Sequence, residues 1–141
     1  MTNWEIARSY LKQGKEIYKE AESFRQRGVW HLAVRRSQEA VEIALKGALR
    51  CVGIEVPKLH DVGILLRRHK GRFPDDFGQR VDHFSSISRK LRKERETSFY
   101  GDEESGIPPD ELYIEEDAET ALKEAALILK AFEELMEKKM S

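Results

Sequence analysis

The sequence is poor in the residues that mark several classes of protein. Its 141 residues include one cysteine, Cys51, so a disulfide framework is excluded. Alternating runs of β-branched residues bounded by turns are absent, which argues against strands. The aliphatic runs are only a few residues long, so we expect no membrane-spanning segment. Because the N-terminus lacks a secretory signal region, we expect the protein in the cytoplasm.

Hydrophobic residues recur at intervals of three and four, which is the spacing of an amphipathic helix. The pattern predicts a short helix over 61–70 and four long helices over 3–26, 29–52, 75–99 and 116–138. A proline-containing stretch, 101–115, is the one long loop that we expect. The sequence therefore predicts an all-α domain spanning 1–141, folded as an up-down antiparallel helical bundle.

The charges are unevenly divided along the chain, although the net charge is only -1. Residues 1–101 hold 21 Lys and Arg against 13 Asp and Glu, whereas residues 102–141 hold 4 against 13. Two basic clusters stand out, at 67–72 and at 89–95. They fit either a solvated face or a patch that binds a polyanion.

One charged residue interrupts the apolar face expected for the helix over 75–99. Steps of three and four along that face lead from Phe84 to Arg95, so Arg95 is predicted to point inward. Either its stem covers the core while its head reaches water, or its guanidinium contacts an anion in a groove. A carboxylate partner is offered by a row on the second helix, formed by Gln38, Glu42 and Lys46.

Motifs for metals and cofactors are missing. The histidines have no ligand spacing with one another or with Cys51, and no phosphate-binding glycine loop occurs. We therefore expect no metal site and no cofactor. His60, next to Asp61 at the start of the short helix, fits either a capping role or proton transfer.

The stretch from Trp30 to Leu66 and the segment from Arg95 to Asp102 resemble the HEPN domain family (higher eukaryotes and prokaryotes nucleotide-binding), and the likeness extends over about residues 5–136. The last helix opens with Asp117 and Ala118, which also fit. In the first stretch the similar residues are Ala33, Ser37, Gln38, Ala40, Glu42, Leu45, Lys46, Gly53, His60, Asp61 and Leu65.

This resemblance implies a helical bundle that forms a homodimer. In many members an Arg, followed by four to six residues and a His, forms a metal-independent ribonuclease site at the dimer interface; others act beside a nucleotidyltransferase partner. Arg95 matches the Arg, but positions 100–102 are Tyr100, Gly101 and Asp102 in place of the His. A tyrosine, with an ordinary pKa of about 10, is poorly suited to proton transfer near neutral pH.

Three hypotheses follow. The first is a non-catalytic HEPN protein that binds a nucleotide or RNA, or pairs with a nucleotidyltransferase in a two-component, toxin-antitoxin-like system. Its expected ligand-binding residues are Glu42, Lys46, His60, Arg92 and Arg95. The second is a ribonuclease in which Arg95 and Tyr100 are catalytic, with His60 as another substitute for the missing His. The third is a purely structural helical dimer.

Overall fold

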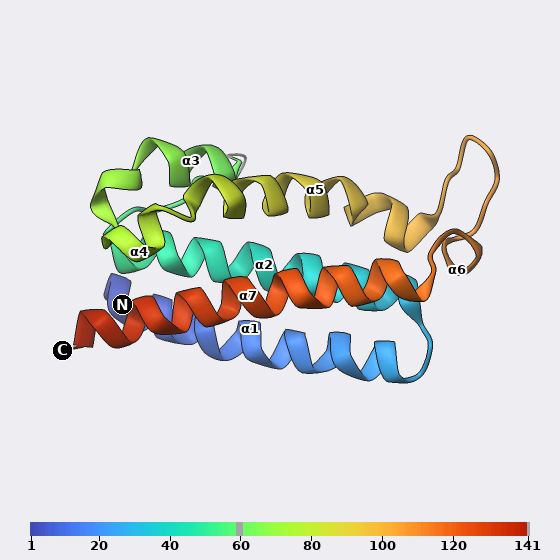
Figure 1. The fold of residues 1–141 in the computed structure, drawn as a ribbon, viewed down its shortest axis with the longest axis horizontal. Coiled ribbons are helices and arrows are strands. Elements are labelled where there is room, and N and C mark those ends of the chain that lie inside the picture. The colour runs from blue at the N-terminus through green and yellow to red at the C-terminus, as the bar shows by residue number, and fades with distance from the viewer. Residues whose placement is uncertain (59–60, 141) are drawn as a thin grey trace.

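Four long helices form the body of the molecule in a computed structural model that describes residues 1–58 and 61–140. They are α1 (Asn3–Gln26), α2 (Trp30–Cys51), α5 (Val81–Tyr100) and α7 (Glu115–Met140). The chain alternates in direction from one long helix to the next, so that both termini lie at the same end (Figure 1). The predicted all-α, up-down bundle is thereby confirmed.

Helix α2 is central, because α1, α5 and α7 all pack against it (Figure 1). Its buried side chains extend from the first turns to the last, and most of them are small. The spacing of small and apolar residues at steps of three and four predicts an inward face, and every member of that face is buried: Ala33, Ser37, Ala40, Val41, Ala44, Leu45, Ala48, Leu49 and Val52. Small side chains let a neighbouring helix approach closely, so α2 can be enclosed on several sides.

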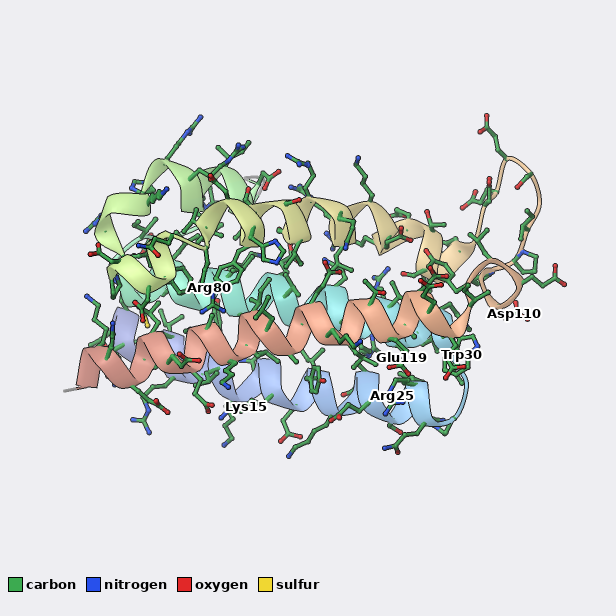
Figure 2. The ribbon with its side chains drawn as sticks, viewed as in Figure 1. Lys15, Arg25, Trp30, Arg80, Asp110 and Glu119 are labelled. Carbon is green, nitrogen blue, oxygen red and sulfur yellow. The ribbon has the colours of Figure 1, made fainter. Side chains whose placement is uncertain are left out.

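Helix α7 packs against both α1 and α2. Its predicted inward face is also confirmed, with Leu122, Leu129 and Phe132 in the core. Ion pairs join the outer edges of α1 and α7: Arg25 lies 3.2 Å from Glu119, and Lys15 contacts Glu133 (Figure 2). Exposed pairs of this kind add little stability, so packing on α2 holds α7 in place.

Two boundary predictions were wrong. The single helix expected over 75–99 is broken at residues 79–80 into α4 (Asp75–Gly78) and α5. An aromatic cluster explains the bend, because Phe77 stacks on Phe73 at 4.5 Å and meets the edge of Phe84 at 5.4 Å. The loop expected over 101–115 contains a helical turn, α6 (Pro109–Leu112), which begins with a proline at a favoured position.

The short helix predicted over 61–70 is present as α3 (Val62–Arg68), followed by a 3₁₀ turn, η1 (Lys70–Arg72). Asp61 caps α3 by accepting a hydrogen bond from the Gly63 amide at 2.8 Å. None of the helices in the described part of the chain is long and apolar enough to cross a membrane.

The packing of Phe132 of α7 directly on Gly47 of α2 gives a stability test. A Cβ added at Gly47 would lie 2.3 Å from Cζ of the buried Phe132 ring. We expect Gly47→Ala to destabilise the fold by about 1–3 kcal/mol through overpacking, although alanine is the better helix former. Urea denaturation measures the change.

Gly71→Ala is the matched control, because a Cβ there would meet nothing within 4 Å. Its free energy of unfolding should stay within about 0.5 kcal/mol of the wild type. A Gly47→Ala protein more stable than the wild type would contradict tight packing of α7 on α2.

Candidate functional site

The prediction that Arg95 points into the bundle was wrong, because Arg95 is exposed. The inward row of α5 instead passes through Phe84, Ile87, Leu91 and Ser98, which are buried, and through the half-buried Glu94. Both rows use steps of three and four, and the periodicity of the sequence alone could not choose between them.

Glu94 is accommodated by a tyrosine from the loop before α7. The Tyr113 hydroxyl donates a hydrogen bond to the Glu94 carboxylate. Burial, together with the neighbouring Glu94 charge, raises the pKa of Tyr113 well above its ordinary value. The phenol therefore stays protonated and acts as a permanent donor to Glu94.

On this side of α5, a cavity of about 210 Å³ opens between α5 and α7. Most of its charged residues are acidic: Glu94, Glu116, Asp117 and Glu124. The one cation that lines it, Lys90, is already paired with Glu124 at 2.5 Å. An excess of carboxylates repels phosphate groups, so this side of α5 is unfavourable for a nucleotide.

The opposite edge of α5 carries several of the residues expected to bind a ligand. Glu42 of α2 and Arg92 of α5 line one shallow pocket, together with Gln38, Ser88 and Val62. Lys46 reaches its margin, because the Lys46 ammonium lies 3.8 Å from the Glu42 carboxylate. The structure thus brings Glu42, Lys46 and Arg92 together on what we call the α2–α5 surface.

Polar groups in this pocket are incompletely matched. Gln38 is only 4% exposed, and its Nε2 donates to Glu42 at 3.4 Å. Its Oε1 is buried with no hydrogen-bond partner among the described residues. The enclosed space, about 10 Å³, has room for a single water-sized donor. Glu42 pairs with Gln38 and Lys46, so it is not the carboxylate partner considered for Arg95.

Arg92 lies at the junction of α5 and α3. Its guanidinium is 3.6 Å from the carboxylate of Asp61, the residue that caps α3. His60, which was expected to contribute to the site, lies outside the described residues. Asp61, which follows His60 in the sequence, pairs with Arg92 and thereby holds α3 against α5.

Arg95 lies one helical turn beyond Arg92 on the same edge of α5. Its backbone carbonyl accepts a hydrogen bond from the Arg35 guanidinium, which also lies over the Phe99 ring at 5.2 Å from the centroid. The Arg95 side chain itself has no ion pair or hydrogen bond within the described ranges. A free guanidinium is thus placed beside a second arginine and an exposed ring.

Tyr100 is exposed at the last position of α5, with its ring edge against Phe99. Tyr100 is five positions beyond Arg95, which corresponds to about 140° around a helix. Within one chain, therefore, the two predicted catalytic residues do not share a face. Phe99, four residues from Arg95, does.

The sequence predicted no site role for Arg35. The signal for Arg35 was its place one turn before Gln38 on α2, but the contact with α5 depends on tertiary packing.

Cys51 lies against the Met136 sulfur, and burial raises the pKa of its thiol to about 11. It is therefore an unreactive packing residue. The described residues contain no group of His, Cys, Asp or Glu that could hold a metal ion.

Comparison with known proteins identifies the class. The HEPN domain model matches residues 7–135, so the chain belongs to the HEPN domain family, as the sequence predicted. Two solved structures are similar: TT1696 from Thermus thermophilus (TM-score 0.72, 28% identity, 91% of this chain and 96% of that one) and ST0689, an archaeal HEPN homologue (TM-score 0.69, 28% identity, 92% and 97%). No curated protein matches the sequence.

Proposed function

We propose that this HEPN protein is a non-catalytic homodimer that binds a nucleotide or RNA on the α2–α5 surface, with Arg95 as the principal contact to phosphate. The supporting observation is the position of Arg95. The resemblance matches Arg95 to the family's arginine, and the Arg95 guanidinium is exposed and has no acidic partner within the described ranges. A free guanidinium binds phosphate through charge-assisted, often bidentate hydrogen bonds.

The surroundings of Arg95 favour a nucleotide over a simple anion. Arg35, whose Nε lies 3.9 Å from the Glu39 carboxylate, donates to the Arg95 carbonyl and so ties α2 to the end of α5 beside Arg95. Phe99 is 51% exposed, so the part of its ring that Arg35 and Tyr100 leave open is accessible to a base. Phosphate and base recognition would thus be adjacent on one surface.

Dimerisation is consistent with the family, in which it is common, and with the end of α5. Tyr100 is exposed there, and Ile114 is 58% exposed in the loop before α7. Exposed apolar side chains in one region favour an interface with another chain. In such a dimer, each protomer would contribute Arg95 close to the interface.

Ribonuclease activity is the second candidate, and the chain supports it poorly. Residues 96–102 contain no histidine, and Tyr100 lies on a different face of α5 from Arg95 in the same protomer. A Tyr100 from the partner protomer is the only arrangement that would bring the two together. A nucleotidyltransferase partner rests on family membership and is tested by co-purification.

Binding is tested with a labelled RNA of about 15 nucleotides and with labelled ATP, by fluorescence anisotropy at about 50 and about 200 mM salt. We expect Arg95→Ala to weaken RNA binding about tenfold or more at the lower salt, because a charge-assisted contact is lost. Arg8→Ala is the control, since Arg8 is an exposed arginine on α1. Wild-type affinity in the Arg95→Ala protein, or undetectable binding of both ligands at low salt, would contradict the proposal.

Catalysis is tested separately by incubating the purified protein with labelled RNA in the presence of EDTA. We expect the RNA to remain intact, because the chain places no histidine in the segment that follows Arg95. Cleavage that disappears in both Arg95→Ala and Tyr100→Phe would establish the ribonuclease instead. Cleavage that survives Arg95→Ala would point to a contaminating nuclease.

A further inference from the structure

Helices α3 and α5, with the turn η1, carry a surface rich in exposed cations, although Asp82 and Glu96 of α5 are exposed as well. Its cations are all exposed, and none has an acidic partner or hydrogen bond within the described ranges. They are Arg67, Arg68, Lys70, Arg72, Arg89 and Lys93, which we call the α3–α5 basic surface. Nitrogen-tipped side chains project from the outer sides of these helices in Figure 2.

Close packing holds α3 in a fixed position against α5, so their cations have a fixed arrangement. A Cβ added at Gly63 of α3 would lie 2.5 Å from Oγ of Ser85, so only glycine allows α3 to lie this near to α5. The start of α3 is also held by the Asp61–Arg92 pair. Because Asp61 lies near Arg92 and Gly63 near Ser85, α3 runs antiparallel to α5 and carries its arginines away from Arg95.

The basic surface therefore continues the α2–α5 surface in one direction. From Arg95 to Ser85 the distance along α5 is about 15 Å, and α3 adds about 7 Å from Gly63 to Arg68. A mononucleotide at Arg95 cannot extend over this length. A strand with a phosphate at every residue can contact both ends.

Cations elsewhere in the molecule are paired with carboxylates, unlike those of the α3–α5 basic surface. Arg25, Arg36 and Lys90 are paired with Glu119, Glu20 and Glu124 at 3.2, 2.9 and 2.5 Å. The acidic excess of residues 102–141 lies in α7 and the loop before it, and α7 has few contacts with α5. The acidic segment thus forms no ion pair with the cations of the α3–α5 basic surface in the described ranges, and the repulsion between these cations falls when an anionic chain binds.

We propose that the α3–α5 basic surface carries the phosphodiester backbone of single-stranded RNA away from Arg95, so that the ligand is an oligonucleotide of several residues. This inference rests on the proposed function, which places the first phosphate at Arg95. A single strand is favoured over a duplex, because the exposed Phe99 ring can stack only on an unpaired base.

The test compares Arg67→Ala/Arg68→Ala with Arg8→Ala/Lys12→Ala, which removes the same charge from exposed cations on α1. Affinities for an oligouridylate of about 15 nucleotides and for UMP are measured across a salt series. We expect the α3 variant to bind the oligonucleotide about tenfold or more weakly at low salt. Its plot of log K against log salt should be shallower by about 1.4, since each lost phosphate contact removes about 0.7. UMP affinity and both affinities of the α1 variant should match the wild type.

Each other outcome overturns the inference and separates it from the proposed function. If the α3 variant binds the oligonucleotide like the wild type while Arg95→Ala weakens it, the basic surface is not used and the proposed function stands. If the α1 variant binds the oligonucleotide as weakly as the α3 variant, net charge alone determines the affinity. If the wild type binds UMP as tightly as the oligonucleotide, the surface does not bind an extended RNA strand. If the wild type binds neither ligand, both fail. Should the α3 variant not fold, Arg89→Ala/Lys93→Ala replaces it with the same expected loss.

Discussion

The architecture depends on one constraint, which is the close approach of three helices to the small-residue face of α2. Alanines and a glycine leave α2 so narrow that α1 and α7 enclose it on one side while α5 lies on the other. At Gly47, the Phe132 ring occupies the space where a side chain would be. Gly14 of α1 plays the same part, because a Cβ there would lie 2.8 Å from the Leu129 side chain. Bulkier residues at these positions would separate the helices and remove the common core.

This packing also determines where the charged surfaces lie. Helix α5 packs on both α2 and α3 and has few contacts with α7, so its edge toward α7 and its last turns, which bear Arg95 and Phe99, remain accessible. The edge toward α7 is acidic and is partly occupied by the contact between Tyr113 and Glu94. The edge toward α3 carries Arg92 and Arg95 and continues into the basic last turn of α3. One helix thus separates a surface that repels phosphate from one that attracts it.

The sequence was sufficient to predict those features that depend on local periodicity. Most of the inward face of α2 was predicted, because a helix buried on several sides repeats its small residues, but the buried Val34, Gln38 and Gly47 lie outside the predicted face. The sequence also predicted where α3 begins, and it predicted that the chain belongs to the HEPN domain family. The family assignment needed no three-dimensional information, because the spacing of residues between Trp30 and Leu66 and around Arg95 carries it.

Features that depend on tertiary contacts could not be predicted. The direction of Arg95 was wrong because two rows on α5 have the same spacing, and Tyr113, distant along the chain, selects the row that contains Glu94. The break at residues 79–80 depends on an aromatic cluster whose members come from both sides of the bend. The contact of Arg35 with the end of α5 joins residues 60 positions apart. Each of these involves a partner that helical periodicity cannot identify.

The account's central claim is that the ligand binds along the edge of α5 that bears Arg92 and Arg95. The most direct measurement is the titration of isotopically labelled protein with single-stranded RNA, followed by NMR of the backbone amides. The account predicts shifts that concentrate in α5 from Ser88 to Tyr100, in the facing part of α2 and in α3, with α1 unchanged. Shifts confined to α1 and to the acidic cavity between α5 and α7 would contradict it.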